Sequence, residues 1–329
     1  MLRKSVTRAV VLLGALALSV YAAFQLSPWP SVWLIRYAFK DGADEAIAST
    51  VPLIPAGVAG QLGLSYAPDE PDAKLDLFTS ASARQPMPTV VWVHGGGFVG
   101  GTRSDLSGYL KILAGKGFAT VAIDYSVAPE ARFPTPVRQT NLALEHLVRS
   151  AARFKLDPQR IFLAGDSAGA HIAAQTALTI SDADYARRLG IRPGLERAAL
   201  RGLVLYCGPY DPTTMSFQGP FASFMRTVVW SYLGTRDPHD PRLAQLAVTP
   251  HVSAAYPPTF ISVGNGDPLA PQSHAFAQAL RARGVEVDAL FFPPDHQPAL
   301  GHEYQLLLTT DAAKLALERS VAFLNAHAK

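Results

Sequence analysis

The chain has 329 residues, of which 49% are hydrophobic, and a formal net charge of +3. This length suffices for one large domain with a smaller appendage, and the hydrophobic content allows a substantial core. The sequence contains no basic patch interleaved with aromatic residues, so nothing in it supports nucleic-acid binding. Cys207 is the only cysteine, which excludes an intramolecular disulfide. No Cys or His cluster has metal-ligand spacing and no phosphate-binding glycine loop is present, so we expect neither a metal nor an organic cofactor.

Residues 1–27 are predicted to be an N-terminal membrane anchor or signal segment. Three basic residues precede an almost wholly apolar stretch, and charge does not return before Arg36. Residues 9–26 lie at the short end of the length needed to span a membrane, and Val20-Tyr21-Ala22 is a weak cleavage site. We expect an uncleaved anchor, with the basic flank in the cytoplasm and the rest of the chain facing the periplasm or exterior. Cleavage, which would release a secreted protein, is the alternative.

Residues 28–75 are predicted to be a mainly helical cap segment, because they combine Trp29, Trp33 and Phe39 with several prolines. A catalytic domain is predicted over residues 76–329. Its strands and helices alternate along the chain, which indicates an α/β fold with a mainly parallel central sheet flanked by helices.

The run Thr89–Val93 is β-branched and aromatic, as in a buried strand, and it leads into the glycine loop His94-Gly-Gly-Gly97. Bare glycines leave backbone N–H groups exposed, and an acyl-transfer site needs such donors where negative charge develops on the carbonyl oxygen. We therefore assign the oxyanion hole to the N–H groups of Gly96, Gly97 and Ala168, and expect His94 to shape the loop. A merely flexible turn is the alternative.

The pentapeptide Gly165-Asp166-Ser167-Ala168-Gly169 lies between a strand-like run, Ile161–Ala164, and a helix-like run that starts at Ala170. This context predicts a nucleophile elbow, a sharp strand-to-helix turn that exposes the hydroxyl group of Ser167. We expect Asp166 to have a structural role at the elbow.

An activated serine needs a base, and the base needs an orienting carboxylate. Asp267 follows the strand-like run Pro258–Val263, at a strand C-terminus where α/β sheets place their chemistry. An N-cap of the next helix is the alternative role for Asp267. His302 and His296 both lie in the loop after the last predicted strand. We choose His302 as the base and keep His296 in reserve.

The segment from about residue 208 to 255 interrupts the alternation of strands and helices and is predicted to be a cap insertion. Four of its aromatic residues are predicted to line the substrate pocket, although each could equally belong to the core of the cap: Phe221, Phe224, Trp230 and Tyr232.

These motifs resemble the bacterial hormone-sensitive-lipase-type esterases of the α/β-hydrolase superfamily. The matching residues, in the family's order, are His94–Gly97, Asp124–Glu130 with Phe133-Pro134, Gly165–Gly169, Asp267-Pro268-Leu269 and His302. The resemblance implies an α/β-hydrolase fold with a helical cap, and hydrolysis of small-molecule carboxylic esters with short or medium acyl chains, without a cofactor. Two departures are that Ser126 stands where an arginine is usual, and that Glu303-Tyr304 follows the base instead of a small residue and Phe.

Two alternative functions remain. A deacetylase or amidase would use the same triad on an envelope or small-molecule substrate. A non-catalytic ligand-binding protein on this scaffold would be expected to lack a triad member, whereas Ser167, Asp267 and His302 are all present. The oligomeric state is not indicated.

Overall fold

A computed structural model describes residues 2–219, 221–237 and 239–329. Its centre is an eight-stranded sheet with the strand order β1-β2-β4-β3-β5-β6-β7-β8. The strands are β1 Val58–Ser65, β2 Lys74–Ser80, β3 Met87–Val93, β4 Ala119–Ile123, β5 Leu156–Asp166, β6 Leu200–Tyr206, β7 Thr259–Val263 and β8 Val287–Phe291. β2 runs antiparallel to both β1 and β4, whereas β4, β3, β5, β6, β7 and β8 are mutually parallel.

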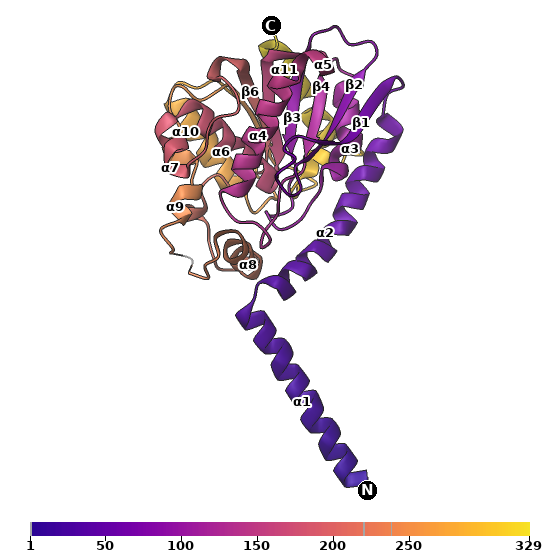
Figure 1. Ribbon diagram of the computed structural model, residues 1–329, viewed down its shortest axis with the longest axis vertical. Helices are drawn as coiled ribbons and strands as arrows, with labels where there is room; N and C mark the ends of the chain where they lie inside the picture. Colours follow the sequence, from indigo (N-terminus) through magenta and orange to yellow (C-terminus); the bar gives the residue numbers. More distant parts are fainter. Residues whose placement is uncertain (1, 220, 238) are drawn as a thin grey trace.

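Helices cover both faces of this sheet (Figure 1). α4, α6 and α10 pack their apolar side chains on one face, and α3 and α11 pack theirs on the other. Parallel strands buried on both faces are expected to be rich in apolar residues, and every residue of β4 and β7 is buried. The predicted α/β architecture with a mainly parallel, helix-flanked sheet is therefore confirmed. The helices of this domain are α3 Ser107–Ala114, α4 Thr135–Arg149, α5 Ala151–Phe154, α6 Ser167–Ser181, α7 Ala183–Leu189, α10 Ala270–Ala282 and α11 Asp311–His327.

The segment between β6 and β7 contains two further helices, α8 Ala222–Leu233 and α9 Leu243–Leu246. Single 3-10 turns connect other elements: η1 Val51–Leu53, η2 Arg103–Leu106, η3 Arg197–Ala199, η4 Pro212–Thr214, η5 Thr249–His251 and η6 Tyr304–Leu306. Directly after Glu303 the chain forms only the short turn η6. The last helix starts at Asp311, where the side chain of Thr310 accepts a hydrogen bond from the N–H of Ala313 and caps it.

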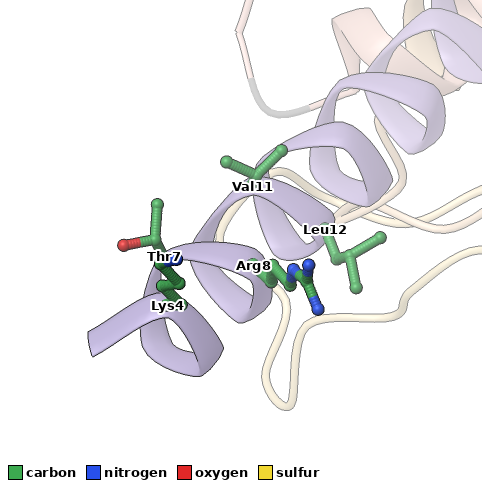
Figure 2. A pocket seen from close by; sticks show the side chains of 5 residues that line it. All are labelled: Lys4, Thr7, Arg8, Val11 and Leu12. Atoms are coloured by element: carbon green, nitrogen blue, oxygen red, sulfur yellow. The ribbon is translucent and has the colours of Figure 1, made fainter. Parts of the chain in front are cut away.

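The N-terminal helix α1, Leu2–Leu26, runs away from the domain (Figure 1). Its stretch Lys4–Leu26 is long and apolar enough to cross a membrane, and no part of it is buried in the protein. A rise of about 1.5 Å per residue gives these 23 residues a length of roughly 34 Å, which matches a bilayer's hydrocarbon core. A shallow hollow on the first turns is lined by Lys4, Thr7, Arg8, Val11 and Leu12 (Figure 2).

The second helix, α2, spans Trp29–Thr50, as expected for the first half of the predicted cap segment. The second half of that segment differs from the expectation, because residues 58–65 form the edge strand β1. Most side chains of β1 are exposed, and the strand is held to β2 by backbone pairing. The sequence therefore shows no apolar alternation there that would indicate a strand.

Candidate active site

Ser167 occupies the turn between β5 and α6, and its φ angle of +50° lies in the left-handed region. The two flanking glycines make this turn possible. A Cβ atom on Gly169 would lie 2.0 Å from the carbonyl oxygen of Val93, and one on Gly165 would lie 2.5 Å from the carbonyl carbon of Gly169. Only glycine is tolerated at such contacts, so the pentapeptide has the geometry of a nucleophile elbow.

Ser167 is hydrogen-bonded to the histidine chosen from the sequence. The Oγ atom of Ser167 lies 2.8 Å from Nε2 of His302, and Nδ1 of His302 lies 2.8 Å from Oδ2 of Asp267. The carboxylate of Asp267 also accepts a hydrogen bond from the N–H of Leu269. The same side chain therefore stabilises the turn after β7 and orients the imidazole of His302. The reserve histidine, His296, instead packs its ring 4.6 Å from that of Phe292. Such an arrangement can activate a serine hydroxyl through an oriented base.

The loops that carry Asp267 and His302 are joined by Asn265, which the sequence analysis did not single out. Its Oδ1 atom accepts a hydrogen bond from the N–H of Leu300, and its Nδ2 donates to the carbonyl oxygens of Pro294 and His296. The N–H of Gly266 also donates to the carbonyl of Leu300. The loop of Asp267 follows β7 and the loop of His302 follows β8. These hydrogen bonds hold the two loops in a fixed position relative to each other.

The environment of His302 favours its charged form. Burial lowers the pKa of its imidazole, but contact with the Cys207 sulfur, the hydrogen bond to Asp267 and the charge of Glu303 outweigh burial, and the pKa is raised well above its usual value. A raised pKa makes His302 a stronger base once it is deprotonated, and it helps the imidazole to hold a proton during a reaction.

Cys207 is buried, one residue past the end of β6. Potential ligand atoms of Cys207, Asp267 and His302 all lie within 4.8 Å of one another. Burial raises the pKa of the thiol to about 11, so it is protonated at neutral pH, whereas the form that binds metals is the thiolate. We therefore interpret Cys207 as a packing partner of His302.

The glycine loop after β3 has the conformation that its sequence requires. Gly96 and Gly97 have φ angles of +104° and +60°, and a Cβ atom on Gly96 would lie 2.2 Å from the carbonyl oxygen of Gly100. Within the described ranges, the N–H groups of Gly96 and Gly97 donate no hydrogen bond. Ala168 is the second residue of α6, where an N–H group has no acceptor inside the helix. These three N–H groups are therefore free to bind an oxyanion.

The residues beneath the loop hold it against the elbow. The Asp166 carboxyl group accepts hydrogen bonds from Nε1 of Trp92 at 2.7 Å and from the N–H of Gly95 at 2.8 Å. The buried ring of His94 contacts the carbonyl oxygen of Gly95 through Nδ1 and stacks on Tyr125, whose hydroxyl group donates to the carbonyl of His94. These contacts agree with structural roles for Asp166 and His94.

Glu303 is an additional charged group in the site. Its backbone has a φ angle of +58°, and its Oε1 atom lies 3.9 Å from Nε2 of His302. It is also hydrogen-bonded to Asp166. Burial and the charge of Glu303 raise the pKa of Asp166 well above its usual value, which favours the protonated form of Asp166. The only feature of the sequence that could have indicated Glu303 as part of the site is its position directly after His302.

Helix α2 is fixed to the glycine loop by Arg36. Its guanidinium group donates to the carbonyl oxygens of Val99 and Ala128 and forms two hydrogen bonds with Glu130. The Ser126 hydroxyl, at the position where an arginine is usual, instead donates to the carbonyl of Pro71. The guanidinium group that pairs with Glu130 therefore comes from a helix 94 residues earlier in the chain.

The four aromatic residues expected at the substrate pocket have different surroundings. A Cβ atom on Gly97 would lie 2.9 Å from the ring of Phe224, so this ring covers the glycine loop. Tyr232 is buried and stacks on Phe98 of the same loop. Trp230 instead lies under the guanidinium group of Arg236, and Phe221 is 53% exposed. Contact with the loop thus distinguishes Phe224 and Tyr232 from the other two residues.

Comparison with known proteins identifies the family. The family model of the α/β hydrolase fold matches residues 90–296. An esterase of Gibberella moniliformis is 29% identical over 65% of this chain and 68% of its own length, and an acetyl esterase of Salmonella paratyphi B is 27% identical over 72% and 73%. The crystal structure of esterase B from Lactobacillus rhamnosis superposes with a TM-score of 0.78 at 22% identity, over 92% of this chain and 96% of that one. The chain therefore belongs to the α/β hydrolase fold family.

Proposed function

We propose that the protein is a serine carboxylesterase that hydrolyses short- to medium-chain acyl esters through an acyl-enzyme intermediate. The observation that carries this proposal is the hydrogen-bonded series from Ser167 through His302 to Asp267, next to a glycine loop with free N–H groups. The similarity to proteins named esterase and acetyl esterase supports an ester substrate with a small acyl group.

The first half of the reaction acylates the serine. Nε2 of His302 takes the proton of the Ser167 hydroxyl group as Oγ attacks the ester carbonyl, while Asp267 stabilises the imidazolium ion. The N–H groups of Gly96, Gly97 and Ala168 bind the oxyanion, and the loss of one such donor typically costs about 3 kcal/mol of barrier. The intermediate then collapses, and the alcohol leaves with the proton that His302 returns.

The second half repeats this chemistry with water. His302 removes a proton from a water molecule that attacks the acyl carbonyl, the same N–H groups bind the second oxyanion, and the proton returns to Oγ of Ser167 as the acid leaves. No other co-reactant is needed.

We further propose that α1 is an uncleaved membrane anchor, with the hydrolase domain on the periplasmic or outer side. The span Lys4–Leu26 has no buried residue and begins with basic residues, which favour the cytoplasmic side. Carbonate extraction of membranes and mass spectrometry of the mature N-terminus test this proposal. A protein that resists extraction and retains residues 2–26 supports the anchor, whereas an N-terminus beyond residue 20 in a soluble fraction supports a secreted form.

The esterase proposal is tested with p-nitrophenyl esters from acetate to palmitate and the full-length protein in detergent. Ser167→Ala and His302→Ala should each lose about 10⁴-fold or more in kcat. His296→Ala serves as the matched control and should keep wild-type activity. Absence of turnover on every ester, or retention of activity by His302→Ala, would overturn the proposed chemistry.

A further inference from the structure

An exposed aromatic face lies at the start of α2, directly after the proposed membrane span. Only Ser27 and Pro28 separate α1 from α2. The side chains of Trp33, Leu34 and Tyr37 are 63%, 61% and 78% exposed. Their spacing places them on one side of the helix. We call these three side chains the interfacial face.

The composition along α2 indicates what covers this face. Trp and Tyr are enriched where a membrane meets water, and α2 begins where a span ending at Leu26 would leave the hydrocarbon core. Charged residues are absent from the exposed side of α2 until Lys40, after which Asp41, Asp44 and Glu45 are exposed. The one earlier charge, Arg36, is directed toward Glu130 and the glycine loop. The apolar part of α2 is thus confined to its membrane-proximal turns.

Two arginine contacts fix the orientation of the domain relative to the span. Arg236, in the loop after α8, donates hydrogen bonds to the carbonyl oxygen of Gln25 at 2.6 Å and to its side-chain oxygen at 3.1 Å. Arg36 binds α2 to the carbonyl oxygen of Val99 in the glycine loop. Figure 1 accordingly shows α8 beside the junction of α1 and α2, at the end of the domain from which α1 extends.

The same two helices cover the oxyanion loop. A Cβ atom on Gly97 would lie 2.9 Å from Phe224 of α8 and 3.7 Å from Phe39 of α2. The rings of Phe39 and Phe224 contact each other, with centroids 6.0 Å apart. An ester that approaches the N–H group of Gly97 therefore passes α8 and α2, and α2 also carries the interfacial face.

We propose that the interfacial face rests on the lipid bilayer, so that the active site opens toward the membrane surface and takes amphiphilic esters whose acyl chains are dissolved in the bilayer. This inference rests on the proposed esterase function and names its substrate class. An interfacial aromatic face places the site at the depth of ester groups in the headgroup region. The carbonyl can reach Ser167 without the complete acyl chain having to cross water, which would be unfavourable for each exposed methylene group.

The test compares two substrates with the full-length protein in phosphatidylcholine vesicles. One substrate is water-soluble p-nitrophenyl acetate, and the other is the medium-chain ester p-nitrophenyl decanoate dissolved in the vesicles. The double variant Trp33→Glu with Tyr37→Glu should hydrolyse the acetate at the wild-type rate but lose about tenfold on the decanoate, because charged residues replace the membrane-seated rings. Leu62→Glu is the matched control, since Leu62 is 65% exposed on the edge strand β1, and it should leave both rates unchanged. Equal loss on both substrates, or no loss on the decanoate, would overturn the inference.

A second measurement does not depend on catalysis. Brominated phosphatidylcholine quenches tryptophan fluorescence only near the bilayer, so wild type should be quenched and Trp33→Phe should show clearly less quenching. If neither ester is hydrolysed but Trp33 is quenched, the esterase proposal fails while the membrane contact stands. If both esters are hydrolysed and Trp33→Phe is quenched to the same degree as wild type, the membrane-facing orientation fails while the esterase stands.

Discussion

The carboxylate of Glu303 lies 3.9 Å from Nε2 of His302, the same nitrogen that is hydrogen-bonded to Ser167. A second acidic group, Asp166, is hydrogen-bonded to Glu303 and precedes the serine in the chain. The carboxyl groups of Asp166 and Glu303 therefore link the elbow to the base, in addition to the bond between Ser167 and His302. This link makes the protonation state of His302 sensitive to Glu303.

Glu303→Gln should move the acidic limb of the kcat/KM–pH profile to lower pH. Glu303 favours the imidazolium form of His302, so its removal lowers the pKa, and the neutral base becomes available at lower pH. Two charges at this separation interact by about 1 kcal/mol in water, which corresponds to a shift of roughly 0.5–1 pH unit. Glu286→Gln is the control, because Glu286 is exposed beside His327. An unmoved limb, or one that moves to higher pH, would contradict this role of Glu303.

Asp166→Asn should be far better tolerated than Asp166→Ala. The raised pKa of Asp166 favours a neutral side chain, and Asn is neutral. The single amide oxygen of Asn can still accept from Nε1 of Trp92 while its Nδ2 donates to Glu303, so only the bond from the N–H of Gly95 is lost. Ala leaves the indole N–H of Trp92 and the N–H of Gly95 unpaired in a buried place, which costs about 1–3 kcal/mol each. Thermal unfolding and kcat/KM measure both effects. Equal losses in the two variants would contradict this hydrogen-bonding role of Asp166.

Asn265→Ala should lower kcat more than it changes KM. The variant loses the bonds that align the loop of Asp267 with the loop of His302, and a misplacement of about 1 Å in a catalytic group can cost as much as 100-fold in rate. Its free energy of unfolding should fall by about 1–3 kcal/mol. Asp295→Ala, in the same loop, is the control. Wild-type kcat in Asn265→Ala would rule out a positioning role.

Arg36→Ala should reduce both thermal stability and kcat, because α2 would lose its attachment to the glycine loop and to Glu130. The expected loss in the free energy of unfolding is about 1–3 kcal/mol. Lys40→Ala removes an exposed positive charge one turn later on the same helix and should be neutral. Circular dichroism melting curves and ester hydrolysis distinguish the two variants, and an effect of equal size in both would contradict the specific role of Arg36.

The parts of the molecule that were predictable from sequence are those with strong local patterns. The largely apolar or β-branched runs within β3, β5 and β7 indicated buried strands, and the glycine spacing around Ser167 indicated the elbow. The positions of Asp267 and His302 at the ends of strands then predicted that they would meet, as they do. The type of each residue and its position at the end of a predicted strand were sufficient for these inferences.

The features that were not predicted depend on contacts between distant parts of the chain. Arg36 meets Glu130 across 94 positions, and Asn265 reaches Leu300 across 35. No local pattern indicates either pairing. β1 was not predicted for a different reason. Its side chains are mostly exposed, and the strand is defined by backbone pairing with β2.

The most direct test of the account is labelling of the full-length protein with a fluorophosphonate, followed by mass spectrometry of the labelled peptide. We predict one stoichiometric adduct on Ser167, its absence in Ser167→Ala, and labelling slowed by about three orders of magnitude or more in His302→Ala but unchanged in His296→Ala. An adduct on another residue, or labelling of Ser167 at the wild-type rate without His302, would contradict the proposal that Ser167 is the nucleophile activated by His302 and Asp267.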